Sequence, residues 1–133
     1  MSYPINKTEQ EWLAELGPER YKILRGKGTE FPHSGKYNLH FESGTYVCGA
    51  CKTPLFESAS KFNAHCGWPS FDASIPGKVA YVEDRSHGMI RTEILCASCG
   101  SHLGHVFDDG PTETGTRYCV NSLSVDFMGE DIR

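Results

Sequence analysis

Four of the six cysteines in this chain form two pairs with the same spacing. Two residues separate Cys48 from Cys51, and two separate Cys96 from Cys99. That spacing lets a tight turn aim both sulfurs at one tetrahedral ion, so the pairs predict a zinc site with four thiolate ligands. Such a site has no open coordination position, so its metal would be structural and would join two hairpins that are distant in sequence. Iron is the alternative ion, because four thiolates hold either metal.

Other interpretations of the paired cysteines are disulfides, scattered buried thiols or a redox-active CxxC. The last requires a βαβ context, which the surrounding pattern lacks. Residues 1–7 contain no basic region followed by an apolar core, so we expect no secretory signal and a cytoplasmic protein. A reducing cytosol disfavours disulfides, which leaves zinc as the preferred interpretation.

Cys119 lies in the sequence Arg117-Tyr118-Cys119-Val120-Asn121-Ser122. If this segment is a strand, alternation puts Arg117, Cys119 and Asn121 on one face. A cation beside a thiol stabilises the reactive thiolate, and an amide two residues later can orient a polar substrate or a water. The alternative is that Cys119 is a small apolar core residue, as most free cysteines are.

Cys66 lies in His65-Cys66-Gly67-Trp68-Pro69-Ser70-Phe71, where glycine and proline indicate a loop that can move. Aromatic side chains in a loop, here Trp68 and Phe71, suit a wall against a small apolar group, although both could instead close the edge of the core. Two cysteines in such contexts suggest an attacking thiol and a resolving thiol.

His102 and His105 lie three residues apart with a glycine between them. They could converge on one site as hydrogen-bond donors or proton carriers. A structural role is the alternative. Zinc ligation is less suitable, because four thiolates already fill that shell.

Two helices and several strands must position these residues. Thr8-Glu9-Gln10-Glu11 predicts a capping box, and Gly17-Pro18 divides a helical segment at about residues 6–27 into two helices. From Tyr37 the pattern alternates with period two, which favours a strand at residues 37–41, and a turn at residues 42–44 leads into a strand at 45–47. Further predicted strands are residues 79–83, 90–95, 105–107 and 117–127. The pattern therefore predicts two short helices packed on a mainly β, antiparallel body.

The composition excludes several classes of function. The 133 residues fit one domain, residues 1–133. A net charge of −4 argues against a phosphate-binding surface, so we expect no nucleic-acid partner. No apolar run approaches the ~20 residues that span a membrane, so we expect no membrane partner.

Three motifs in order, Cys66-Gly67-Trp68-Pro69-Ser70-Phe71, His102-Leu103-Gly104-His105-Val106-Phe107 and Arg117 to Ser122, resemble the B-type methionine sulfoxide reductases. The paired cysteines stand where zinc-binding members of that family carry them. The likeness runs from about Lys36 to Phe127. It implies two antiparallel sheets with short helices at the side.

The resemblance also implies an oxidoreductase that repairs oxidised proteins by reducing the R epimer of methionine sulfoxide. Cys119 would attack the sulfoxide sulfur and become a sulfenic acid. Cys66 would resolve it to a disulfide, which thioredoxin would reduce. Trp68 would pack on the substrate methyl group, with Phe71 as a second aromatic contact. The remaining residues would assist protonation of the sulfoxide oxygen or support those that do: His102, His105, Asn121, Asp109 and Arg117.

Two other classes compete with this interpretation. A zinc-ribbon binding module explains the paired cysteines but not Cys66, Cys119 or the histidines. A zinc hydrolase or nucleobase deaminase needs an open metal position and a glutamate two residues from a ligand, and neither histidine is followed by that pattern.

Overall fold

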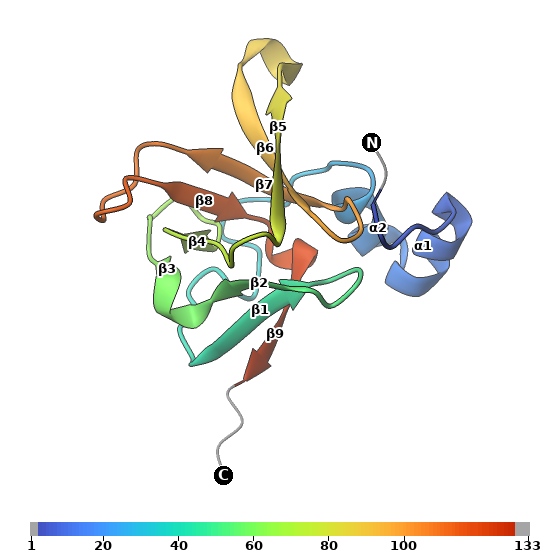
Figure 1. Cartoon of the computed structure of the whole chain (residues 1–133), viewed down its shortest axis with the longest axis horizontal. Coiled ribbons are helices and arrows are strands. Elements are labelled where there is room, and N and C mark those ends of the chain that lie inside the picture. Colours follow the sequence, from blue (N-terminus) through green and yellow to red (C-terminus); the bar gives the residue numbers. More distant parts are fainter. Residues whose placement is uncertain (1–2, 130–133) are drawn as a thin grey trace.

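The computed structural model describes residues 3–129. Met1, Ser2 and residues 130–133, which the predicted domain includes, lie outside the described residues. Two short helices lie beside two antiparallel sheets, so the predicted mainly β fold with two sheets is confirmed (Figure 1). No helix within residues 3–129 has the length and apolarity needed to cross a membrane.

The helices begin where the sequence predicts. In α1 (Glu9–Leu16) the Glu11 amide donates to Thr8 Oγ1 at 3.1 Å, and the Thr8 amide donates to Glu11 Oε1 at 2.8 Å. This reciprocal capping box satisfies two N–H groups that the first turn leaves free. Pro18 opens α2 (Pro18–Leu24), because its fixed φ suits a first helical position. Trp12 of α1 is fully buried and joins the helices to the core.

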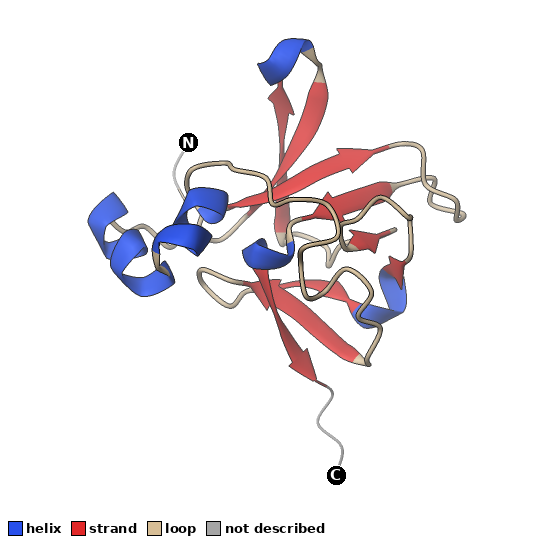
Figure 2. Cartoon of the chain, turned by 180° about the vertical axis from the view of Figure 1, so that it is seen from behind, coloured by secondary structure: helices blue, strands red, loops and turns tan. Residues whose placement is uncertain are grey.

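The smaller sheet has the order β2-β1-β9, and the larger has the order β3-β4-β8-β7-β6-β5. The first comprises β1 (Gly44–Cys48), β2 (Pro54–Glu57) and β9 (Val125–Gly129). The second comprises β3 (Lys61–Phe62), β4 (Ser70–Phe71), β5 (Val79–Asp84), β6 (Arg91–Cys96), β7 (His102–Phe107) and β8 (Arg117–Val120). Short 3-10 turns occur at Ser58–Ser60, Ser86–Gly88 and Ser122–Ser124. Figure 2 shows the two sheets from behind.

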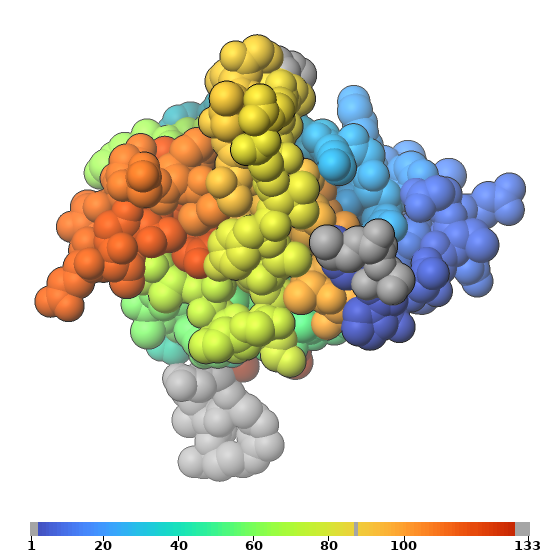
Figure 3. All heavy atoms as spheres, turned by 45° about the horizontal axis from the view of Figure 1, so that its top comes forward, coloured from blue at the N-terminus to red at the C-terminus, as the bar shows by residue number. Residues whose placement is uncertain are grey.

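The β5–β6 hairpin projects from the body of the protein. Figure 3 shows it in yellow along the middle of the molecule, between the orange-red strands on one side and the blue N-terminal segment on the other, with its outer end at the top. Its two strands belong to the large sheet, and residues Thr92 to Leu95 of β6 pair with β7.

Two predicted strands are wrong in detail. Residues 37–41 form turns rather than a strand: Tyr37 is buried and its amide donates to Ser122 Oγ, while Leu39 and Phe41 are exposed. Residues 117–127 form two strands, not one. The 3-10 turn Ser122–Ser124 separates β8 from β9, because the chain leaves the large sheet there and enters the small one.

Candidate functional site

The four paired cysteines meet between the two sheets. Cys48 and Cys51 lie at the turn from β1 to β2, and Cys96 and Cys99 lie at the turn from β6 to β7. Gly100 follows the second pair with φ +76°, the positive value expected for a residue that closes such a turn. The cluster therefore joins one hairpin of each sheet, as predicted.

The spacing of the sulfurs fits a tetrahedral ion. Sγ of Cys48 lies 3.7 Å from Sγ of Cys99, and Sγ of Cys51 lies 3.6 Å from Sγ of Cys96. All four sulfurs lie within 4.8 Å of one another. Zinc–sulfur bonds of about 2.3 Å in a tetrahedron place the sulfurs about 3.8 Å apart, so the donor set and its size suit a thiolate-bound metal. An ion bound by all four sulfurs would have no open coordination position, as in structural zinc sites.

A separate cavity of about 290 Å³ contains the other two cysteines. Its volume is near the lower end of the range of about 300–1,000 Å³ for small-molecule pockets. The residues that line it are Thr29, Cys66, Trp68, Arg91, Gly104, His105, Phe107, Arg117, Cys119, Val120 and Asn121. Sγ of Cys66 lies 3.9 Å from Sγ of Cys119, so the cavity brings together two thiols that are far apart in sequence.

Strand register aligns a row of polar residues that crosses the cavity wall at Cys119 and His105. Ser70 of β4 pairs with Cys119 of β8, and Cys119 pairs with His105 of β7. His105 in turn pairs with Glu93 of β6. Directly opposed residues of neighbouring strands point to the same face, so one row across the sheet carries a thiol, an imidazole and a carboxylate.

A bulge in β7 brings His102 toward the same site. Strict alternation would put His102 and His105 on opposite faces, because they are three residues apart. The register shifts between Ile94 and Leu95, which leaves Leu103 without a partner on β6. The extra residue re-aims His102, as bulges do, and the two imidazole centroids lie 5.7 Å apart. The two rings therefore lie side by side, although only His105 lines the cavity.

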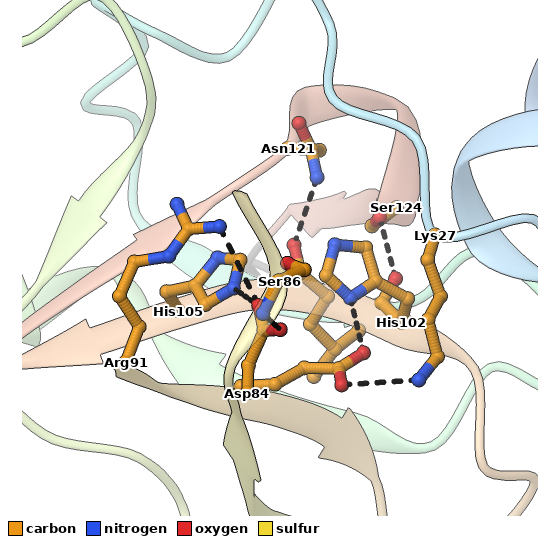
Figure 4. A network of polar contacts seen from close by, with 10 residues as sticks. Lys27, Asp84, Ser86, Arg91, His102, His105, Asn121 and Ser124 are labelled. Atoms are coloured by element: carbon orange, nitrogen blue, oxygen red, sulfur yellow. Dashed lines mark hydrogen bonds and ion pairs between the residues drawn. The ribbon is translucent and has the colours of Figure 1, made fainter. Parts of the chain in front are cut away.

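Each histidine is held by a carboxylate that the sequence analysis did not single out. His102 Nδ1 donates to Glu93 Oε2 at 2.7 Å, and His105 Nε2 donates to Asp84 Oδ2 at 2.7 Å. Lys27 and Arg91 pair with the carboxylates of Glu93 and Asp84, respectively (Figure 4). Glu93 adjoins the apolar pair Ile94-Leu95 in a predicted strand, and a glutamate that is buried there requires a partner.

His102 lies behind His105 rather than on the cavity wall. It is 3 % exposed, and its Nε2 atom has no hydrogen-bond partner among the described residues. Burial lowers the pKa of His105, as do the charges of Arg91 and His102, whereas the bond to Asp84 acts to raise it. The net shift is downward, so His105 is mainly neutral at pH 7.

Asn121 is fixed on both sides of its amide. Its Oδ1 accepts from the Glu30 amide at 3.1 Å, and its Nδ2 donates to the Leu103 carbonyl at 3.3 Å. Because Asn121 lines the cavity beside Cys119, these two bonds set the orientation of a polar group close to the thiols.

Arg117 and Asp109 form a bidentate pair at the cavity edge. Arg117 Nε and Nη2 donate to the Asp109 carboxylate at 2.9 and 3.1 Å. The guanidinium also lies 4.4 Å from the centroid of the Phe107 ring. Asp109 is not part of the cavity lining, so its contact with the site is through Arg117.

The thiols have unequal acidity. Burial raises the pKa of Cys119 to about 12, with Cys66 and Glu30 adding to that shift and Arg117 opposing it. Burial also acts to raise the pKa of Cys66, but hydrogen bonds with Ser70, Trp68 and Cys119 and the charge of Arg117 together outweigh it, so the net shift of that pKa is downward. As the sequence led us to expect, Arg117 lowers the pKa of Cys119, but burial raises that pKa by more than Arg117 lowers it.

The two aromatic residues predicted to contact substrate have different positions. Trp68 lines the cavity, and its Nε1 donates to the Glu30 carbonyl at 3.1 Å. Phe71 is fully buried and stacks on Phe56 at a centroid distance of 4.4 Å. The structure therefore places Phe71 in the core, the alternative considered above, because β4 points it between the sheets.

Comparisons with known proteins agree on one family. The SelR domain matches residues 16–129. The chain is 56 % identical to a peptide methionine sulfoxide reductase MsrB of Variovorax paradoxus, over 96 % of this chain and 98 % of that protein. It is 52 % identical to a protein of the same name from Leptospira interrogans, over 98 % of this chain and 100 % of that protein. The chain therefore belongs to the SelR-domain family of MsrB peptide methionine sulfoxide reductases.

Proposed function

We infer that this chain is an oxidoreductase that reduces the R epimer of methionine sulfoxide in proteins to methionine by thiol chemistry. Family membership over nearly the whole length supports the reaction. The observation that carries the mechanism is the 3.9 Å separation of the Cys66 and Cys119 sulfurs in a cavity lined by an indole and an imidazole. A non-catalytic zinc-ribbon module would account for the four clustered thiols but not for this cavity.

In the proposed reaction the sulfur of Cys119 attacks the sulfoxide sulfur while the oxygen is protonated. Methionine leaves, and the oxygen remains on Cys119 as a sulfenic acid. The sulfur of Cys66 then attacks the Cys119 sulfur, which forms the disulfide and releases the oxygen as water. A dithiol reductant, for which we propose thioredoxin, returns both residues to thiols.

The surrounding residues supply the proton and the binding surface. A sulfoxide oxygen leaves only when protonated, so acids must stand near the nucleophile. We assign to His105 the relay of a proton, which its neutral ring accepts from water and passes to the sulfoxide oxygen. His102 joins this relay through a water at its unpartnered Nε2, and Asn121 orients the oxygen. Arg117, held by Asp109, lowers the pKa of the nucleophile. Trp68 is the wall for the substrate methyl group, and Phe71 is assigned a packing role.

We further propose that Cys48, Cys51, Cys96 and Cys99 hold one structural zinc ion. Their sulfur spacing supports a tetrahedral ion of this size. We also propose that residues 1–133 act as one domain in the cytoplasm, where reduced thioredoxin is available. Neither a nucleic acid nor a membrane has a part in this proposal.

Separated epimers of a methionine-sulfoxide peptide, with dithiothreitol as reductant, test the proposed function. Wild type should reduce the R epimer only, and Cys119→Ser should reduce neither. Thioredoxin should sustain turnover by wild type but not by Cys66→Ser. No reduction of either epimer by folded, metal-loaded wild type would refute the enzyme assignment.

A further inference from the structure

Glu30 lies between two cavity residues without lining the cavity itself. It belongs to the segment that connects α2 to β1 and is 7 % exposed. Its amide donates to Asn121 Oδ1 at 3.1 Å, and its carbonyl accepts from Trp68 Nε1 at 3.1 Å. One residue therefore bridges the indole on one wall and the amide on another.

The side chain of Glu30 anchors this bridge to the sheet. Its Oε1 accepts from the Leu123 amide at 2.9 Å, in the 3-10 turn that directly follows Asn121. Gly35 leaves the room for the carboxyl group, since a Cβ there would lie 2.4 Å from Glu30 Oε2. The loop that carries Glu30 is thus bonded to Trp68 on one wall of the cavity, and to Asn121 and Leu123 on the other.

A second bond holds the Cys66 loop to the same segment. The His33 amide donates to the Gly67 carbonyl at 2.7 Å, and a Cβ on Gly67 would lie 2.7 Å from Cβ of Pro32. Gly67 has φ +93°, which a glycine adopts without strain. The two loops pack closely, so a shift of residues 30–33 would be transmitted to Trp68.

The composition of this contact argues against simple packing. A buried carboxyl group costs free energy unless it is hydrogen-bonded, and Oε2 of Glu30 has no partner among the described residues. An apolar residue would fill the same space at lower cost. An oxygen is required at this position because the Leu123 amide needs an acceptor. The resulting hydrogen bond fixes the backbone of Glu30 relative to Asn121.

We propose that Glu30 is a positioning residue that sets the distance between the Trp68 indole and the Asn121 amide, and thereby the fit of the methyl sulfoxide group. The inference rests on the proposed function, since it assigns these two side chains to the same substrate. Glu30 acts through them and touches no reacting atom. Its carboxylate also contributes to the raised pKa of Cys119, a second and separable effect.

Three substitutions separate these effects from a loss of fold. Glu30→Asp keeps the charge but draws the oxygen back from the Leu123 amide, Glu30→Gln keeps an acceptor without the charge, and Glu30→Ala removes both. Glu42→Ala is the control, because that side chain is 77 % exposed. Each variant is assayed well below its melting temperature, so that only folded protein contributes.

The KM for a methionine-R-sulfoxide peptide is the main readout. Glu30→Asp and Glu30→Ala should raise KM by about tenfold, because both lose the bond to the Leu123 amide. Glu30→Gln keeps an acceptor, so its KM should stay within about twofold of the wild-type value. Glu30→Gln should also speed alkylation of Cys119 at a given pH, because removal of the charge lowers its pKa. A purely structural residue would lower the melting temperature and leave KM unchanged.

Binding to an inactive protein provides a measurement independent of turnover. Peptide affinity is measured for Cys119→Ser with and without Glu30→Asp, and the second substitution should weaken it by a similar factor. Values of KM and affinity within about twofold of the parent for Glu30→Asp would overturn the inference. Wild type that neither binds nor reduces the peptide would instead refute the proposed function.

Discussion

The sulfurs of Cys66 and Cys119 lie 3.9 Å apart in the reduced protein, although their sequence positions differ by 53. A disulfide needs about 2.05 Å, so the two atoms must approach by about 2 Å. The sequence led us to expect a mobile loop around Cys66. The geometry shows that a small adjustment of this loop suffices, because strand pairing of Ser70 with Cys119 already holds it beside β8.

This proximity should control the acidity of Cys119. Cys66 contributes to the pKa of about 12, so Cys66→Ala should lower that pKa and increase the thiolate fraction at any pH below it. Alkylation of Cys119 by iodoacetamide, followed by peptide mass spectrometry from pH 7 to 10, should become faster. Arg117→Gln should have the opposite effect, because Arg117 lowers the pKa. An identical pH profile for Cys66→Ala and wild type would contradict the coupling.

The charges around His105 should shift its titration in opposite directions. Asp84 raises its pKa and Arg91 lowers it, so Asp84→Asn should move the pKa further down and Arg91→Gln should move it up. Titration of the His105 ring resonances by NMR measures both changes. Arg85→Gln is the matched control, because that side chain is 69 % exposed. Shifts of the same sign in the first two variants would show that the local structure had changed instead.

The cysteine cluster should stabilise the contact between the two sheets. Removal of the metal, or Cys99→Ser, should lower the melting temperature by more than about 15 °C, since each kcal/mol lost corresponds to about 4 °C at this size. Calorimetry with metal analysis measures this. Cys66→Ala should keep its metal and its melting temperature. A metal-free protein that melts like the metal-loaded form would exclude a structural role for the ion.

Trp68 and Phe71 should respond differently to truncation. Phe71→Leu removes the stack on Phe56 and should lower the free energy of unfolding by about 1–2 kcal/mol with KM unchanged. Trp68→Leu should raise KM for the sulfoxide peptide by about three- to tenfold, because it removes the proposed wall for the methyl group. Denaturant unfolding and steady-state kinetics measure the two quantities. A rise in KM for Phe71→Leu would instead support the original prediction that Phe71 contacts the substrate.

Local sequence signals predicted those features that depend on neighbouring residues. The Thr8–Glu11 capping box and the CxxC turns are formed by residues close together in the chain, and both are present. Alternation along β8 correctly placed Arg117, Cys119 and Asn121 beside one cavity. The strand expected at residues 37–41 failed because alternation alone cannot supply a pairing partner.

Features that depend on long-range register were not predictable in the same way. The carboxylates on His102 and His105 come from β6 and β5, and their partners follow from which strands pair and where β7 bulges. Phe71 was misplaced for a similar reason, since the face of a two-residue strand depends on the neighbours it pairs with. Glu30 lies 91 residues from Asn121, and only the folded chain shows the contact.

The most direct test of the central claim is one turnover without an external reductant, followed by mapping of the oxidised cysteines. Reduced wild type should convert the R-sulfoxide peptide to about one methionine per chain and contain a Cys66–Cys119 disulfide afterwards. Cys66→Ser should also form about one methionine, with Cys119 trapped by dimedone as a sulfenic acid. Methionine formation that leaves Cys119 as a free thiol would contradict the account.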